Sequence, residues 1–273
     1  MSLIDSFVTY LKFALPGWRY LVLGLLIGGA NTAVVAKTIP IAFAGEPNSA
    51  YENGVKQGIL EANLQGEFLG VTYELVPWQS GGDFVAVVVA GDEDAVLRIS
   101  KSESDVPVLN TQATSDRLRA ACRTNLFHLI PSQQMFSDAE AQWRSKHPQS
   151  NAQARAWHHS FRKYAAAQLN GRYHESFETD MDDAAWAGWA ATKLLADVLV
   201  RAPELMNESL INELKTNVAF DGQKGIDMTF RETGQLAQPL LLIEDDSIKG
   251  EAPVRGVVDI TDLDSLGETS CPK

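Results

Sequence analysis

Residues Phe84–Gly91 form a continuous hydrophobic run that is rich in β-branched side chains. Such a run is typical of a strand that is covered on both faces in a parallel sheet. A second apolar strand is predicted at Val106–Asn110, and the segment between the two has apolar residues at helical spacing after an acidic start. That segment is predicted to be a short crossover helix. Phe84–Thr114 is therefore predicted to form a right-handed β-α-β unit.

The chain before this unit alternates between strand and helix patterns. Strands are predicted at Lys37–Glu46 and Gly70–Val76. The link Pro77–Asp83, which joins the second of these to the central unit, is too short for a helical crossover. Either the strands that it joins are antiparallel or a helix has been lost there.

A helix is predicted between those two strands. It begins after Ser49, an N-cap residue with Glu52 three positions on, and runs to about Leu64. Gly54 and Gly58 lie on its inner surface, where each costs about 1 kcal/mol relative to alanine. We expect a close approach of the helix to the sheet as the compensation.

Beyond Thr114 the predicted elements are mainly helices. They lie at Met135–Pro148, Asn151–Tyr173, Met181–Ala202 and Ser209–Asn217. A hairpin is predicted next, with strands at Ile226–Phe230 and Pro239–Ile243 around a turn at Glu232–Gly234. No strand is predicted between Trp143 and Arg155.

The amino-terminal residues carry an export pattern. Basic residues precede the apolar run Tyr20–Gly29, and Val34-x-Ala36 fits a small-residue cleavage site. We expect a signal peptide over residues 1–36 and a mature chain that starts at Lys37. The alternative is an uncleaved anchor, because the apolar stretch is almost long enough to span a bilayer. In both cases the folded part lies outside the cytoplasm, where a disulfide persists.

The composition of the chain excludes some classes of function. The chain has 273 residues, of which 45% are hydrophobic, and a net charge of -12, which indicates an acidic globular protein. Nucleic acid is excluded as a partner, because no clustered positive surface is available to bind phosphates. The two cysteines, Cys122 and Cys271, lack the CxxC spacing of zinc or redox sites and remain free to pair with each other.

Neither a metal site nor catalysis is predicted. The side chains considered as metal ligands are His147, His158, His159, His174, Asp180, Asp182 and Asp183. The adjacent histidines diverge on the predicted helix and have no carboxylate at i+4, while the aspartates lack the spacing of a calcium loop and are interpreted as helix caps. No GxSxG, P-loop or Cys-His nucleophile pattern is present. We therefore expect a protein that is not an enzyme and has no resident cofactor.

The order of the elements resembles the type I periplasmic solute-binding proteins of ABC transporters, the leucine/isoleucine/valine-binding class. The matching segments are Asn53–Val76, Val106–Arg119, Asn125–Ser132 and Phe220–Gln235. One branch of this class, associated with pyrroloquinoline-quinone-dependent alcohol dehydrogenases, is similar in the motifs CRTNLFHLIPSQQMFSDAEAQW, AAWAGWAATK, GQLAQPLLL and LDSLGETSC.

The resemblance implies an α/β fold of the periplasmic-binding-protein type I kind. It implies one open parallel or mixed sheet lobe, built from residues 37–125 together with 218–260. Residues 126–217 are expected to form a reduced, mainly helical second lobe, and residues 261–273 a tail. Members of the class close two such lobes over a ligand.

A ligand is expected at the carboxyl ends of the parallel strands. The family's Ala-Thr pair corresponds to Ala113-Thr114, whose small side chain and hydroxyl suit a carboxylate. The acidic loop Gly91–Asp94 has a second interpretation as the cap of the crossover helix, and an exposed turn is the alternative for Trp78 and Gln79. The complete set of predicted ligand-binding residues is Trp78, Gln79, Gly91, Asp92, Asp94, Gln112, Ala113 and Thr114.

The resemblance also implies a disulfide and a function. Cys122 and Cys271 both lie in segments similar to the family's own, so they are expected to pair and tie the tail to the first lobe. The function implied is a periplasmic protein that delivers a small organic solute, amino-acid-like or related to alcohol oxidation, to an ABC permease in the inner membrane. The alternative is a non-transporting accessory protein of a quinoprotein alcohol dehydrogenase system.

Overall fold

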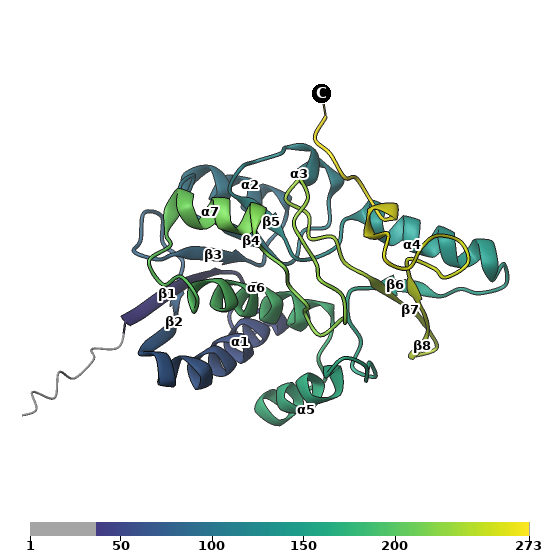
Figure 1. Ribbon diagram of the computed structural model, residues 1–273, viewed down its shortest axis with the longest axis horizontal. Coiled ribbons are helices and arrows are strands. Elements are labelled where there is room, and N and C mark those ends of the chain that lie inside the picture. Colours follow the sequence, from purple (N-terminus) through teal and green to yellow (C-terminus); the bar gives the residue numbers. More distant parts are fainter. Residues whose placement is uncertain (1–36, 273) are drawn as a thin grey trace, which may run out of the picture. The chain divides into compact units, whose positions relative to one another are not determined.

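The structure is a computed structural model that describes residues 37–272 (Figure 1). The predicted signal or anchor segment, residues 1–36, lies outside the described residues. Within residues 37–272, no helix is long and apolar enough to cross a membrane. The elements in chain order are β1 (Lys37–Ala44), α1 (Ala50–Gly66), the 3-10 helix η1 (Glu67–Leu69), β2 (Val71–Pro77), β3 (Ala86–Val89), α2 (Glu93–Ser102), β4 (Val108–Asn110), α3 (Asp116–Ala120), β5 (Leu126–His128), α4 (Gln133–Lys146), β6 (Gln153–Arg155), α5 (Ala166–Phe177), α6 (Asp183–Leu199), α7 (Asn207–Thr216), β7 (Leu240–Glu244), β8 (Ser247–Ala252) and the 3-10 helix η2 (Leu263–Ser265).

Five parallel strands form the main sheet, in the order β2-β1-β3-β4-β5. β1 therefore lies between β2 and β3, and the strand order reverses at the β1–β3 pair. The link between β2 and β3 crosses the sheet without a helix, and its Phe84 is buried in the core that the α2 side of the sheet forms. The antiparallel alternative for this link is therefore wrong, because β2 and β3 both run parallel to β1.

The strands bury both of their faces, as the continuous apolar runs predict. One face contributes Ile39, Ile41, Phe43, Ala86, Val88, Leu109 and Phe127 to a large core with α1 and α6. The other face contributes Ala42, Val87, Val89, Val108 and Leu126 to a second core with α2 and α3. Figure 1 shows α1 and α6 on one side of the strands and α2 on the other. This alternation with a period of two fixes the register of every strand.

Glycines let α1 and α6 pack backbone against backbone. A Cβ atom on Gly54 would lie 2.0 Å from the carbonyl oxygen of Ala185, and one on Gly188 would lie 2.2 Å from that of Tyr51. The prediction that the glycines of α1 permit a close approach is confirmed, but the partner is α6 and not the sheet. The sequence pattern of one helix cannot identify its partner, because both candidate surfaces are apolar.

The glycine contact between α1 and α6 yields a stability prediction. We expect Gly54→Ala to lower the free energy of unfolding by about 1–3 kcal/mol, because the added methyl group overpacks a backbone contact. Gly171→Ala in α5 is the matched control, since nothing lies within 4 Å of its Cβ position. That change should stabilise the protein by about 0.5–1 kcal/mol through helix propensity. Urea unfolding measures both, and equal effects would contradict the packing argument.

A second sheet has three antiparallel strands in the order β6-β7-β8. Three predictions are wrong here. A strand, β6, lies between Trp143 and Arg155. The predicted helix Asn151–Tyr173 is a strand, a loop and then α5. The predicted hairpin partner of β7, Ile226–Phe230, forms two isolated bridges instead, Met228 with Phe220 and Phe230 with Leu236.

Trp157 and Phe161 explain the wrong helix prediction. Their spacing of four residues imitates a helical face, but they lie in a loop, where the ring of Trp157 stacks on that of Trp186 at 5.9 Å. The indole nitrogen of Trp157 donates to Asn170 of α5 at 2.8 Å. The spacing of these aromatic side chains therefore reflects tertiary packing, and Trp157 holds the loop against α6.

The second sheet also contributes to two cores. Leu240 and Leu242 of β7 pack with Met135 and Ala139 of α4, whereas Leu241 belongs to the large core of the main sheet. The main core is therefore continuous from the five-stranded sheet into the three-stranded one. A disulfide joins Cys122, after α3, to Cys271 in the tail, which confirms the predicted pairing.

Candidate functional site

A cavity opens at the carboxyl ends of β1, β2 and β3, where the strand order reverses. Its volume is about 390 Å³, which lies within the usual range of roughly 300–1,000 Å³ for small-molecule sites. In open α/β sheets with this strand order, ligands bind in the crevice at the reversal. The lining residues are Phe43, Ala44 and Gly45 after β1, Pro77 and Trp78 after β2, Val89, Ala90 and Gly91 after β3, and Ala95, Arg98 and Ile99 of α2.

The loops after β1 and β3 pack closely beside this cavity. A Cβ atom on Gly45 would lie 2.6 Å from the ring of Phe43 and 2.9 Å from the Cβ of Ala90. The link between β2 and β3 has no helix, and its first residue, Trp78, lies beside the carboxyl end of β1, where its backbone nitrogen donates to the carbonyl of Phe43 at 2.9 Å. We call this space the switch-point cavity.

Two side chains that line the switch-point cavity, Trp78 and Arg98, carry hydrogen-bond donors. The indole nitrogen Nε1 of Trp78 is buried and has no partner among the described residues. Arg98, on the surface of α2, adds an exposed guanidinium at the mouth. Apolar walls with an unused donor and a cation suit a small apolar compound that carries a carboxylate.

The structure brings together two of the predicted ligand-binding residues, Trp78 and Gly91, in this cavity. Asp92 is the N-cap of α2, because its Oδ1 accepts from the backbone nitrogen of Ala95 at 2.8 Å. The capping interpretation of the acidic loop thus describes Asp92. Gln79, Asp94 and Gln112 are exposed and do not line the switch-point cavity.

The loop Gln112–Thr114 does not line the switch-point cavity. Hydrogen bonds to Asn110 and to the start of α4 hold the loop in its place. Oδ1 of Asn110 accepts from the backbone nitrogens of Gln112 and Ala113, at 3.2 and 2.9 Å. Thr114 is half-buried, and its carbonyl accepts from the backbone nitrogen of Gln133 at the start of α4. The local turn at the end of β4 therefore separates Thr114 from the ends of β1 and β3.

Arg119 of α3 is buried beneath this loop. Its guanidinium donates to the carbonyls of Ala113 at 2.7 Å and Ile130 at 2.7 Å, and to Oε1 of Gln235 at 2.8 Å. Burial lowers the pKa of Arg119, and the nearby carboxylate of Asp116 opposes the shift. The side chain therefore joins α3, the end of β5 and the Gln235 segment.

Arg98 is the charged cavity residue that the sequence interpretation missed. The usable signal was helical spacing, since Ala95 and Arg98 follow Gly91 by about one and two turns on one face of α2. The acidic residues at the start of the crossover helix give the stronger signal, that of a helix cap, and Arg98 comes after them in the same helix.

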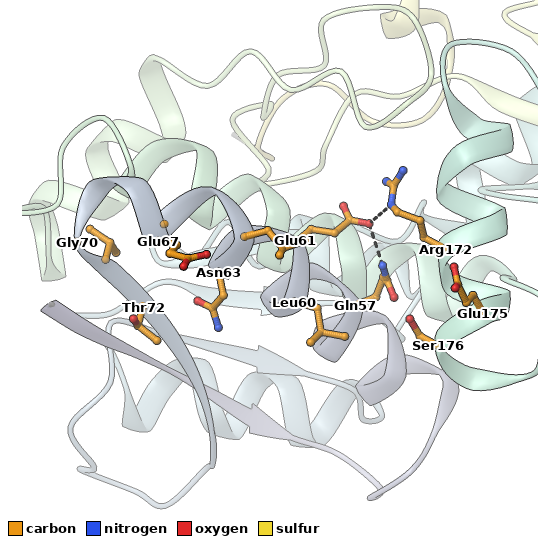
Figure 2. A pocket seen from close by; sticks show the side chains of 13 residues that line it. Gln57, Leu60, Glu61, Asn63, Glu67, Gly70, Thr72, Arg172, Glu175 and Ser176 are labelled. Atoms are coloured by element: carbon orange, nitrogen blue, oxygen red, sulfur yellow. Dashed lines mark hydrogen bonds and ion pairs between the residues drawn. The ribbon is translucent and has the colours of Figure 1, made fainter. Parts of the chain in front are cut away.

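A larger apolar hollow of about 710 Å³ lies along α1, α5 and the start of β2. Figure 2 shows Glu61 between Gln57 and Arg172, which donate to it at 2.9 and 2.8 Å. The indole nitrogen of Trp189 also donates to Glu61, at 3.0 Å. This hollow lies at the amino end of β2, opposite to the edge where ligands gather, and Glu61 is already occupied by protein donors.

Lys224 lines a third cavity, of about 450 Å³, and is only 5% exposed. Its ammonium donates to Gln238 at 2.7 Å and to the carbonyl of Pro239 at 3.0 Å, and it lies 4.0 Å from the ring centre of Trp186. Burial lowers the pKa of Lys224 to about 7, against the opposing charges of Asp183 and Glu251.

This buried lysine predicts a pH dependence of stability. In the unfolded chain the amine keeps its proton up to about pH 10.4. Between pH 7 and pH 9 the unfolded state thus binds more protons than the folded state, so stability rises with pH, by about 2 kcal/mol. Lys224→Met should flatten this rise in urea unfolding at pH 7, 8 and 9. An unchanged slope in the variant would contradict the prediction.

Sequence comparisons name no family. No family model matches the chain, and no curated protein sequence matches it. The described fold is similar to solved structures of ABC transporter substrate-binding proteins. An ABC transporter substrate-binding protein from Desulfitobacterium hafniense has a TM-score of 0.64 at 12% identity, over 78% of this chain and 99% of that chain.

Two further structures have the same fold. A leucine-binding protein, LivK, from Thermotoga maritima has a TM-score of 0.60 at 13% identity, over 79% of this chain and 98% of that chain. A putative branched-chain amino acid ABC transporter protein from Rhodospirillum rubrum has a TM-score of 0.60 at 11% identity, over 78% and 99%. At these identities the likeness concerns the fold, and the chain has the α/β fold of type I periplasmic binding proteins.

Proposed function

We propose that this protein is the solute-binding component of an ABC transporter, exported to the periplasm, and that it is not an enzyme. The switch-point cavity carries the proposal, because it lies at the ligand-binding edge of a sheet whose fold is that of substrate-binding proteins. The solute that fits is a small apolar compound with a carboxylate, such as an amino acid or an acid formed by alcohol oxidation. An inner-membrane permease is the corresponding partner.

The proposed orientation of the solute follows from the polar groups. The carboxylate lies at the mouth beside Arg98, while the apolar part occupies the space between Phe43 and Ile99. Nε1 of Trp78 donates to a second acceptor of the solute. Because one face of the second sheet shares the core of the first, we propose capture mainly by the first sheet, without a wide hinge motion.

A thermal-shift screen tests the function. The compounds are amino acids, short alcohols, aldehydes, acids and quinone cofactors. A solute at 100 times its dissociation constant adds about 2.7 kcal/mol of stability, which raises the melting temperature by about 5–10 °C. If no compound shifts the melting temperature, the transport proposal is wrong, and the accessory protein of a quinoprotein dehydrogenase takes its place.

Calorimetry with variants then tests the site. Removing a hydrogen bond to a charged solute costs about 1.5–3 kcal/mol, so Arg98→Met should weaken binding by roughly ten- to a hundredfold. Trp78→Phe removes the indole donor and keeps an aromatic ring. Arg144→Met, at an exposed arginine of α4, is the control. Thr114→Val tests the loop that the resemblance predicts, and a loss there without a loss in Arg98→Met would move the site to that loop.

A further inference from the structure

A polar cavity of about 730 Å³ lies among β6, the loop after it, the β7–β8 turn and the start of α6. It shares no lining residue with the switch-point cavity. Its wall contains two histidines, one arginine and six carboxylates: His158, His159, Arg155, Asp180, Asp182, Asp183, Glu244, Asp245 and Asp246. The excess of carboxylates gives the cavity a negative potential, which attracts cations.

The two adjacent histidines point in the same direction. Adjacent residues diverge on a helix, but His158 and His159 lie in the loop after β6. Their rings lie side by side, with centroids 4.3 Å apart and planes inclined by 32°. The sequence-based argument against a shared metal site therefore does not apply to this segment.

Both imidazoles converge on one carboxylate. Nε2 of His158 lies 3.0 Å from Oδ1 of Asp246, and Nε2 of His159 lies 3.8 Å from its Oδ2. One ligand atom from each of the three residues lies within 4.8 Å of the others. Around a tetrahedral ion with bonds of about 2.0–2.1 Å, ligand atoms are about 3.3 Å apart. The observed spacing is thus close to that of a three-ligand site.

Two groups of Ser160 lie beside Nδ1 of His158, and they favour opposite tautomers of the ring. The serine hydroxyl lies 2.8 Å from Nδ1 of His158, so Nδ1–H can donate to it and leave the lone pair of Nε2 free. Such an outer hydrogen bond orients most metal-bound histidines. Without metal, Nδ1 accepts from the backbone nitrogen of Ser160 at 3.2 Å, and Nε2–H donates to Asp246. One serine therefore serves both states.

The neighbouring aspartates are occupied by the protein. Asp182 caps α6 by accepting from the backbone nitrogen of Ala185 at 2.9 Å, and Asp183 accepts from that of Trp157 at 2.6 Å. They contribute charge and not coordination. We propose that His158, His159 and Asp246 bind a divalent transition-metal ion of the Zn²⁺ class, with the remaining coordination position open to the cavity. Two imidazoles select such an ion over Mg²⁺ and Ca²⁺, which prefer oxygen.

The ion joins two segments that are far apart in the sequence. His158 is 11% exposed and fixed in the loop, whereas Asp246 is 78% exposed on the β7–β8 turn. Asp245 and Asp246 have positive φ angles of 50° and 54°, and this turn presents Asp246 to the histidines. Binding therefore fastens the edge of the second sheet to the loop after β6, independently of a solute.

Zn²⁺ titration of the tag-free protein after chelator treatment tests the proposal. Calorimetry should find one equivalent, and Zn²⁺ at 100 times its dissociation constant should raise the melting temperature by about 5–10 °C. Loss of an outer-shell partner usually weakens a metal site by about 10–100-fold, so His159→Ala and Asp246→Asn should weaken binding at least that much. Asparagine tolerates the positive φ of the turn, so Asp246→Asn should fold normally.

Asp245→Asn is the matched control, because it removes the same charge from the same turn without touching the histidines. His174→Ala, at an exposed histidine paired with Asp180, is a second control. His174→Ala should retain nearly all of the Zn²⁺ affinity, and Asp245→Asn should lose clearly less of it than Asp246→Asn. The proposal is overturned if the protein binds no Zn²⁺, or if Asp245→Asn and Asp246→Asn weaken binding equally, which would show diffuse attraction only. A failure here leaves the solute proposal intact, since the two cavities have separate variants.

Discussion

Removing the Cys122–Cys271 disulfide is expected to lower the free energy of unfolding by about 5 kcal/mol. The bridge spans a sequence separation of 149 residues. In the chain-entropy treatment, closing a loop of that length removes about 5 kcal/mol of conformational entropy from the unfolded state, near the upper end of measured values. The closed loop contains the whole second sheet and α4, so removal of the disulfide should lower the stability of the entire fold.

The measurement is urea unfolding of the oxidised protein, of the protein in reductant, and of the double variant Cys122→Ala/Cys271→Ala. The reduced protein and the variant should have the same lowered midpoint, and reductant should not affect the variant further. Contacts of the tail remain in both, including the bond from the backbone nitrogen of Gly267 to Asp138 at 2.7 Å. A midpoint that reductant leaves unchanged would show that these contacts alone hold the tail.

The main sheet was predictable because its signals are local. The run at Phe84–Gly91 predicted β3, and the acidic start of the next segment predicted α2. The strand order was not predictable, because pairing β1 between β2 and β3 is a nonlocal choice that no single segment encodes. β6 carries almost no signal either, since Ala154 is the one buried residue of its three.

Only a part of the candidate site was predictable, for the same reason. Trp78 and Gly91 directly follow strands, so the rule for strand ends found them. Arg98 was missed because it comes from a helix that crosses the same edge. Thr114 also follows a strand, but the turn held by Asn110 turns its loop toward α4. His158 and His159 were excluded as metal ligands because a helix was predicted there, and that helix does not form. One wrong secondary-structure prediction was therefore enough to exclude a candidate metal site.

Replacing Arg119 by methionine is expected to lower the free energy of unfolding by about 2–4 kcal/mol. The change leaves Oε1 of Gln235 without its donor. The carbonyls of Ala113 and Ile130 each lose one of two donors and keep the amide nitrogens of Asn110 and Gln235. A buried acceptor left without a partner costs about 1–3 kcal/mol, the two weakened acceptors add to that cost, and removal of a charge that is itself expensive to bury offsets part of the sum. Arg119→Lys keeps the charge but not the planar fork, so it should recover only part of the loss.

Arg117, two residues away on the same helix, provides the control. Its side chain is 85% exposed and pairs with Glu93 at 3.4 Å, an arrangement worth no more than about 1 kcal/mol. Urea unfolding should therefore separate Arg119→Met from Arg117→Met by at least about 1 kcal/mol. Similar midpoints would mean that water replaces the guanidinium at no cost.

The Arg119 variant also separates the two placements of the solute site. Its guanidinium holds the carbonyl of Ala113 from below, so Arg119→Met should loosen the loop Gln112–Thr114 without touching the lining of the switch-point cavity. Solute affinity measured well below the melting temperature should then stay unchanged if the solute binds beside Arg98. A loss of affinity equal to that of Thr114→Val would instead place the solute on the loop, where the sequence alone had put it.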